Sequence, residues 1–233
     1  MISVCIATYN GAAVVLTQLH SILSQLSEGD EVVVSDDASK DGTRRLVEEI
    51  GDSRIRLVDG PAVGSPVANF ENALRHAKGD YIFLSDQDDK WLPGKVEACM
   101  EKLREGYDCV VTDCVVTDRN LDTTAPSFFE LNGTRKGCLY NLLVKNGYLG
   151  CCMAFTRSVM EKSLPFPPDI PMHDIWIGNV AARYGRVTFV NKPYILFRRS
   201  GATASTTAEK SQNGLWRKIR IRWAVLRRLY LWG

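Results

Sequence analysis

The sequence has no stretch that approaches the roughly 20 consecutive apolar residues of a membrane-spanning helix, so it does not predict an integral membrane protein. The apolar segment at its start is short, has no positive charge before it and runs into polar residues. We expect a strand there and no signal peptide. The prediction is a cytoplasmic protein, with peripheral attachment to the inner face of the cell membrane left open.

The sequence also lacks an excess of charge of either sign. Lys and Arg number 29 against 27 Asp and Glu, which gives a formal net charge of +2. No global basic field therefore indicates nucleic acid as a partner, and a charged ligand has to be recognised by a local patch.

Two further kinds of motif are missing. The seven cysteines are an odd number without a C-x-x-C pair, which argues against a zinc module and a disulfide framework. We expect most of them to be small core residues. There is also no phosphate loop of the G-x-x-x-x-G-K type, so the phosphates of a nucleotide would need another means of neutralisation.

What the first half of the chain does contain is an alternation of strand-like and helix-like segments. β-Branched residues predict strands at 2–7 and 31–35, and apolar residues at helical spacing predict a helix over 14–26. The same cycle continues with predicted helices at 43–50 and 69–77 and predicted strands at 55–58 and 81–84. This pattern predicts one α/β domain with a mostly parallel sheet between helices.

Polar residues follow three of the predicted strands. The clusters are Thr8-Tyr9-Asn10, Asp36-Asp37 and Asp86-Gln87-Asp88-Asp89. One such cluster alone is better explained by helix or turn capping. Three at one edge of a sheet favour a binding site, because ligands of parallel sheets bind beyond the carboxyl ends of the strands.

Asp86 and Asp88 are the candidate metal ligands of this edge. Carboxylates at positions i and i+2 leaving a strand can project to the same side and hold Mn²⁺ or Mg²⁺. Such a cation neutralises a departing diphosphate as a Lewis acid.

The second half of the chain has a looser pattern. It predicts a helix near 94–105, a strand at 109–114 and a long loop at 120–137. A proline-rich segment then delivers His173 and Asp174 to the start of an amphipathic helix. From its position alone, Asp174 is as well explained by helix capping as by catalysis.

The end of the chain differs from the part before it. Residues 201–214 are rich in Ser, Thr and Ala and indicate a flexible flap or linker after a domain at 1–200. Residues 215–233 predict a basic amphipathic helix, whose apolar stripe comprises Trp216, Ile219, Trp223, Leu226 and Tyr230. Cationic charge with Trp favours a membrane surface, and docking on the catalytic domain or on a second subunit stays open.

Three blocks of sequence, at 2–11, 34–43 and 79–89, resemble the family 2 glycosyltransferases. The resemblance extends over about residues 1–200 and implies the GT-A fold, an inverting single displacement and a D-x-D motif at the third block. It implies that Asp88 with Asp86 holds the metal and that Asp174 is the base that deprotonates the acceptor hydroxyl. The donor contacts expected are Thr8, Tyr9, Asn10, Asp36, Asp37, Asn69, Asp86, Gln87, Arg198 and Arg199.

The resemblance is greatest to the bacterial rhamnosyltransferase-like branch, which builds surface polysaccharides. It implies a dTDP- or UDP-sugar donor, with dTDP-rhamnose among the candidates, and a glycan or lipid-linked glycan acceptor. The acceptor contacts expected are Trp91, Gly150, Cys151, Cys152, His173 and Trp176. For the two tryptophans, stacking on a sugar and burial in the core are equally well supported.

One departure from the family concerns Ser200, which stands where similar proteins often carry a metal- or diphosphate-binding His. A hydroxyl is a poorer ligand for Mn²⁺ than imidazole, so Arg198 and Arg199 would take a larger share of phosphate binding.

The alternative function is a catalytically silent nucleotide-sugar-binding or assembly subunit. A nucleotidyltransferase ranks last, since no Gly-rich, basic loop follows the first strand.

Overall fold

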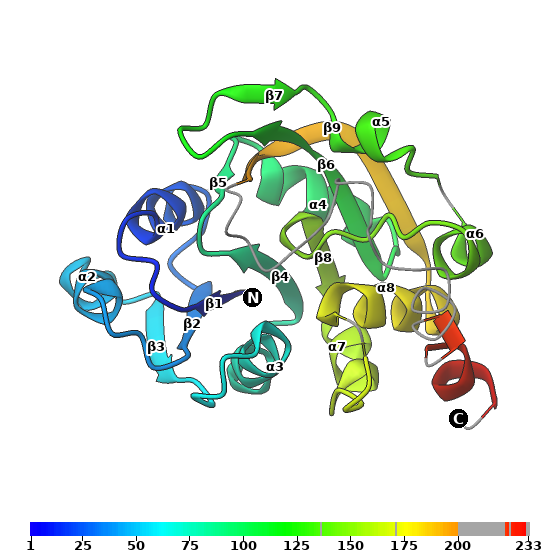
Figure 1. Ribbon diagram of the computed structural model, residues 1–233, viewed down its shortest axis with the longest axis horizontal. Coiled ribbons are helices and arrows are strands. Elements are labelled where there is room, and N and C mark those ends of the chain that lie inside the picture. Colours follow the sequence, from blue (N-terminus) through cyan, green and yellow to red (C-terminus); the bar gives the residue numbers. More distant parts are fainter. Residues whose placement is uncertain (136, 171, 200–221, 224, 232–233) are drawn as a thin grey trace.

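The computed structural model describes residues 1–135, 137–170, 172–199, 222–223 and 225–231 (Figure 1). The strands are β1 (Ile2–Thr8), β2 (Glu31–Asp36), β3 (Ile55–Asp59), β4 (Tyr81–Asp86), β5 (Lys90–Trp91), β6 (Cys109–Thr117), β7 (Thr123–Ala125), β8 (Met153–Thr156) and β9 (Val187–Arg198). The helices are α1 (Val15–Leu23), α2 (Thr43–Glu49), α3 (Pro66–His76), α4 (Lys95–Arg104), α5 (Phe128–Asn132), α6 (Cys138–Leu143), α7 (Arg157–Ser163) and α8 (His173–Tyr184). A 3₁₀ turn, η1 (Gly150–Cys152), and a π-helical turn, η2 (Arg227–Leu231), complete the set within the described residues.

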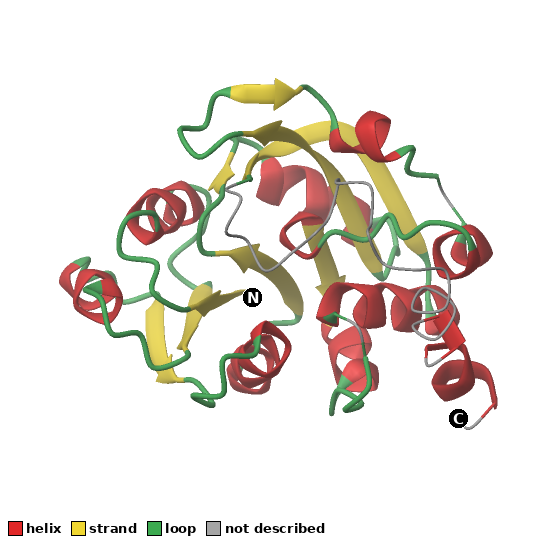
Figure 2. Ribbon diagram, viewed as in Figure 1, coloured by secondary structure: helices red, strands yellow, loops and turns green. Residues whose placement is uncertain are grey.

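The described strands form one sheet with helices packed around it (Figure 2). Its order is β3-β2-β1-β4-β8-β6-β9-β5, and β7 pairs with β6. The α/β class predicted from the alternating segments is confirmed.

The first four strands of this order run parallel to one another, as the sequence predicts. Their register places Thr8 beside Asp36 and Ala7 beside Asp86. The polar residues at the strand ends therefore lie along one edge of the sheet.

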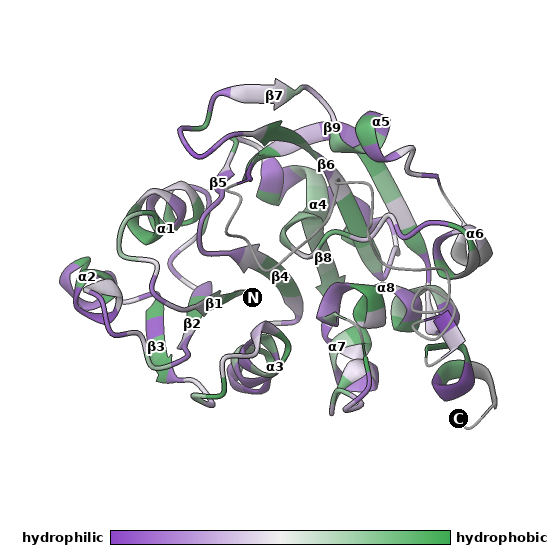
Figure 3. Cartoon of the chain, viewed as in Figure 1, coloured by the Kyte–Doolittle hydropathy of each residue, from purple (hydrophilic) through white to green (hydrophobic). Residues whose placement is uncertain are grey.

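The other half of the sheet is mixed. β8 pairs antiparallel with β4 and β6, whereas β9 runs parallel to β6 and antiparallel to β5. β6 is hydrophobic over most of its length (Figure 3) and is buried at every position except the partly buried Val115. It therefore anchors this half of the core.

Helix α3 begins earlier than predicted. The Ser65 side chain accepts a hydrogen bond from the Ala68 N–H, and Pro66 occupies the first turn. Both features stabilise a helix start, so Asn69 and Phe70 lie one turn inside the helix, where they are buried.

The described part of the tail packs on the rest of the chain. Val225 and Leu229 are 1% and 4% exposed, and Arg228 forms an ion pair with Asp169 at 3.1 Å. Trp223, by contrast, is 54% exposed. The predicted linker at 201–214 and the start of the predicted tail helix lie outside the described residues.

No helix within the described residues has both the length and the apolar character needed to span a bilayer.

Candidate active site

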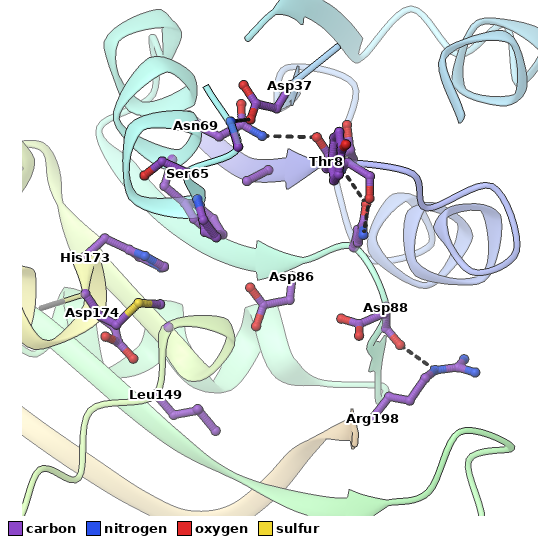
Figure 4. A pocket seen from close by; sticks show the side chains of 18 of the residues that line it. Thr8, Asp37, Ser65, Asn69, Asp86, Asp88, Leu149, His173, Asp174 and Arg198 are labelled. Carbon is purple, nitrogen blue, oxygen red and sulfur yellow. Dashed lines mark hydrogen bonds between the residues drawn. The ribbon is translucent and has the colours of Figure 1, made fainter. Parts of the chain in front are cut away.

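A cavity of about 320 Å³ lies at the edge where β1, β2 and β4 end (Figure 4). α3 covers one side of it, and the start of α8 together with η1 covers another. The cavity is lined by the following residues expected from the sequence: Thr8, Tyr9, Asp37, Asn69, Asp86, Gln87, Asp88, Gly150, His173, Asp174 and Arg198. The structure thus brings together most of the residues expected to bind donor and metal.

The side of the cavity near β1 and α3 is held by hydrogen bonds among its own residues. The Asn69 side-chain amide donates to the Thr8 carbonyl at 3.1 Å, and the Asp37 carboxylate accepts the Gly64 N–H at 2.8 Å. The Gln87 side chain pairs with both the N–H and the carbonyl of Tyr9, at 2.9 and 3.0 Å. These bonds fix the walls before any ligand arrives.

Three expected donor contacts do not line the cavity. The Asp36 carboxylate is buried and accepts hydrogen bonds from the hydroxyls of Thr8 and Ser39, at 2.9 and 2.6 Å, so it supports the wall from behind. The Asn10 side chain accepts the Lys40 N–H instead. Arg199 donates its backbone N–H to the end of β6, and Ser200 lies outside the described residues.

The two tryptophans expected at the acceptor side belong to the core. Trp91 is 2% exposed and packs against Phe83, with ring centroids 5.8 Å apart. Trp176 is 5% exposed, and its indole N–H donates to the Ser163 carbonyl. The stacking interpretation is therefore wrong for this structure, because neither ring offers a face to a ligand.

Cys151 and Cys152 are also fully buried, behind the cavity wall. Gly150 alone of the expected acceptor loop lines the cavity. The six cysteines whose side chains the structure describes are free and buried, which confirms the expectation that most cysteines are small core residues.

The floor of the cavity is an acidic turn between β4 and β5. Burial and, to a smaller extent, the neighbouring carboxylates of Asp88 and Asp174 together raise the pKa of Asp86 to about 7. The Arg198 guanidinium donates to the Asp88 carbonyl at 2.6 Å, and the Arg198 N–H donates to Asp89 Oδ1 at 2.9 Å. Asp89 Oδ2 is buried without a hydrogen-bond partner.

This floor fits a divalent cation. Carboxylate oxygens are the preferred ligands of Mg²⁺ and suit Mn²⁺, and Asp86 and Asp88 both point into the cavity (Figure 4). The unpartnered oxygen of Asp89 and the raised pKa of Asp86 both indicate negative charge in need of compensation.

Asp174 lies across the cavity from the floor, in the first turn of α8. Its Oδ1 accepts the Ile175 N–H at 2.7 Å, and burial raises its pKa to about 6. A carboxyl with this pKa is ionised at neutral pH and takes up a proton more readily than an ordinary Asp does.

His173 is the neighbouring wall residue. It is 3% exposed and stacks on Phe70 with centroids 4.0 Å apart, and neither ring nitrogen has a hydrogen-bond partner. Burial lowers its pKa to about 3, so the imidazole is neutral. It lines the cavity with unused hydrogen-bonding capacity.

Several wall residues were not predicted from the sequence: Ser65, Phe70, Leu149, Met172 and Phe197. Ser65 carried a usable signal, because Ser before Pro predicts the start of a helix at the sheet edge. The four apolar residues carried no signal in the sequence, because residues of the same types also form the core.

Comparisons with known proteins agree with this geometry. The model of the family described as "Glycosyl transferase family 2" matches residues 3–164. The chain is 24% identical over 227 residues to the Escherichia coli UDP-Glc:alpha-D-GlcNAc-diphosphoundecaprenol beta-1,3-glucosyltransferase WfgD, covering 97% of this chain and 85% of that protein. It is 28% identical over 248 residues to the Shigella flexneri dTDP-rhamnosyl transferase RfbG. This match covers 93% of this chain and 80% of that protein.

A Campylobacter jejuni GalNAc(5)-diNAcBac-PP-undecaprenol beta-1,3-glucosyltransferase is 31% identical over 118 residues, but this match spans 49% of the chain and 38% of that protein.

Among solved structures, Staphylococcus aureus TarS 1–349 in complex with UDP-GlcNAc matches with a TM-score of 0.71 at 17% identity, over 98% of this chain and 67% of that one. The Pyrobaculum calidifontis mannosyltransferase PcManGT, in complex with GDP-Man and Mn²⁺, matches with a TM-score of 0.63 at 24% identity. This match covers 97% of this chain and 64% of that one. These likenesses confirm the expected fold.

Proposed function

The chain belongs to glycosyl transferase family 2, and from this premise we propose that it transfers a sugar from a nucleoside-diphosphate donor to a hydroxyl of a glycan acceptor, with inversion. One observation carries the proposal. A single cavity is lined by the strand-end residues Thr8, Asp37, Asp86 and Asp88 on one side and by Asp174 on the other. Such an arrangement suits a ligand with a diphosphate in the middle and a reacting carbon at one end.

The nucleoside would bind between β1, β2 and α3. Thr8, Asp37 and Asn69 line this part and are held by the hydrogen bonds described above. A UDP- or dTDP-sugar is the proposed donor class, supported by the donors named for the relatives from E. coli and S. flexneri. dTDP-rhamnose remains one candidate within it.

Asp86 and Asp88 would hold Mn²⁺ or Mg²⁺, which when bound supplies Lewis-acid neutralisation of the diphosphate. PcManGT was solved with Mn²⁺. Arg198 lines the cavity beside Asp88 and adds a fixed positive charge for the phosphates.

Asp174 would act as the catalytic base. In a single displacement the acceptor oxygen forms its bond to the anomeric carbon while the bond from that carbon to the diphosphate breaks. The hydroxyl proton passes to the Asp174 carboxylate. Asp174 lines the same cavity as Asp86, and a carboxylate serves as a base when it lies within hydrogen-bond reach of the proton it takes.

The proposed acceptor is a glycan or lipid-linked glycan of bacterial surface polysaccharide synthesis. The names of the E. coli and C. jejuni relatives specify undecaprenol-linked acceptors. Peripheral attachment at the cytoplasmic face of the membrane, through the basic tail at 215–233, would bring the enzyme to such an acceptor.

The test is calorimetric titration of the full chain with dTDP and with UDP, each with and without Mn²⁺. We expect metal-dependent binding of at least one nucleotide, lost in Asp88→Ala and kept in Asp122→Ala, which removes an exposed carboxylate of the loop before β7. Release of nucleoside diphosphate with candidate acceptors then measures transfer. Absence of nucleotide binding under every condition would overturn the proposal.

A further inference from the structure

Behind the cavity floor lies a second group of potential metal ligands. A carboxylate oxygen of Asp86, a carboxylate oxygen of Asp89 and the Cys151 sulfur all lie within 4.8 Å of one another. Asp86 lines the cavity, whereas Asp89 and Cys151 are fully buried behind it. Asp88, the other expected metal ligand, is not a member of this group.

Asp89 has an unused ligand atom at this place. Its Oδ1 accepts the Arg198 N–H, but its Oδ2 is buried without a hydrogen-bond partner. A buried carboxylate oxygen normally has a partner, because removal from water is costly without one. The Cys151 thiol is the neighbour of this carboxyl, and burial raises the pKa of Asp89. The place is therefore one where a cation can replace the protons of buried acidic groups.

The nearest buried cation of the described residues does not fill this role. Lys95 is fully buried, but its ammonium group donates to the Cys151 carbonyl and lies 4.3 Å from the centroid of the Trp91 ring. It holds the η1 turn against the floor and so fixes the position of Cys151.

We propose that a divalent cation binds on the inner side of Asp86, with Asp86, Asp89 and the Cys151 sulfur as ligands. Cation–ligand bonds of about 2.0–2.6 Å allow two ligands of one ion to lie up to about 5 Å apart, so the observed spread suits a single ion. Cys151 binds as the thiolate, and its proton leaves to the solvent as the ion enters through the cavity.

The sulfur ligand sets the metal preference of this inner site. Thiolates select thiophilic ions such as Zn²⁺ and Cd²⁺, whereas Mg²⁺ prefers oxygen alone. Because the inner site shares Asp86 with the cavity, an ion there takes a carboxylate that donor binding would use. Inhibition of transfer by Zn²⁺ follows from this sharing, and that consequence alone rests on the proposed function.

The test uses Cd²⁺ and the ultraviolet charge-transfer band of a cadmium–thiolate bond, measured on the full chain without nucleotide. We expect a saturable band in the unmodified protein, lost in Cys151→Ser and weakened at least tenfold in apparent affinity in Asp89→Asn. Cys5→Ser is the matched control, because Cys5 is equally buried but lies in β1 outside the group. It should keep the band.

Asp88→Asn separates the inner site from the cavity metal site. It should leave the cadmium band unchanged, since Asp88 is not among the three ligands. Mg²⁺ should fail to displace Cd²⁺ at concentrations at which Zn²⁺ succeeds.

Two results would overturn the proposal. One is the absence of a band in the unmodified protein, which would leave Cys151 as a buried thiol only. The other is a band that persists in a folded Cys151→Ser variant, which would place the ion on another thiol. Because the readout needs neither nucleotide nor transfer, a failure of the proposed function would leave this result unaffected.

Discussion

Asp174 is the residue whose substitution separates chemistry from binding. Asp174→Asn keeps size and polarity but removes the proposed base, so we expect transfer to fall by about 10² to 10⁴-fold with nucleotide affinity retained. Because burial raises the pKa of Asp174 to about 6, the carboxylate form is lost as pH falls through that value. The rate of transfer should therefore rise with pH through about 6 and level off above it.

The measurement is nucleoside diphosphate release across a pH series. Glu161→Gln, which neutralises an exposed acid on α7, is the control and should behave as the unmodified chain. Unchanged turnover in Asp174→Asn would remove the base assignment.

His173 lies so close to residue 150 that only glycine fits there without a shift. A Cβ atom at residue 150 would lie 2.9 Å from His173 Nε2, so Gly150→Ala has to displace the imidazole and disturb its stacking on Phe70. A displacement of a cavity wall by about 1 Å can lower the rate on the order of 10²-fold. We expect that loss in nucleoside diphosphate release, whereas Gly29→Ala, where a Cβ meets nothing within 4 Å, should have no effect. Full activity of Gly150→Ala would show that the His173 wall does not contact the substrate.

At the scale of elements, the end of β9 holds the acidic turn in place. Arg198→Met keeps the apolar stem but removes the donor to the Asp88 carbonyl. An acceptor left without its partner costs about 1–3 kcal/mol, so we expect the free energy of unfolding to fall by that amount. Nucleotide binding should weaken, because the cavity loses a positive charge for the phosphates.

Denaturant titration and calorimetry measure the two effects of Arg198→Met. Arg104→Met, at the exposed end of α4, is the control and should change neither. If Arg198→Met lowered neither quantity, the turn would not depend on β9.

The elements that could be predicted from the sequence are those stabilised by local patterns. β1, β2 and β4 are apolar runs that end in polar clusters, and their parallel register follows from the helices between them. β9 was not predicted, because its partner β6 lies about 80 residues earlier in the chain and no local pattern specifies that pairing. Likewise, the loop expected at 120–137 contains β7 and α5, which are short elements that depend on packing against β6.

The same distinction applies to the candidate site. Charged residues at strand ends, such as Asp86 and Asp88, could be placed because their type and position both indicate ligand binding. Phe70 and Phe197 could not, because a side chain that faces a cavity and one that faces the core follow the same hydrophobic pattern. Trp91 shows the converse, since a residue next to the acidic turn points away into the core.

At the scale of the whole molecule, the tail is tied to the rim of the catalytic domain. Arg227 and Arg228 lie 3.9 and 3.1 Å from the Asp169 carboxylate, in the segment that leads to His173. Val225 and Leu229 are buried, so docking on the catalytic domain, one of the two alternatives left by the sequence, describes this part of the tail. The apolar stripe predicted for the tail included Trp223, but in the structure Trp223 is exposed, and Val225 and Leu229 are buried.

Docking through Val225 and Leu229 leaves the exposed Trp223 available for a membrane surface. The sequence adds Arg217, Lys218 and Arg220 shortly before it. Each Lys or Arg near an anionic bilayer contributes about 1 kcal/mol of attraction, which salt screens. We expect the full chain to float with vesicles of phosphatidylglycerol and phosphatidylcholine but not with phosphatidylcholine alone, and to be released by high salt. Replacing Arg217, Lys218 and Arg220 together by Gln should abolish flotation without exposing the buried Val225 and Leu229.

The control replaces three exposed cations of the catalytic domain by Gln, namely Arg45, Arg75 and Lys162. It alters the net charge by the same amount. If binding depends on where the charge lies, this control still floats, because a bilayer attracts the cations that face it within a Debye length of about 8 Å. If both triple variants fail to float, only net charge matters and the tail is not a membrane-binding element. If the unmodified chain stays in the bottom fraction with anionic vesicles, the proposed lipid-linked acceptor would have to be reached by another route.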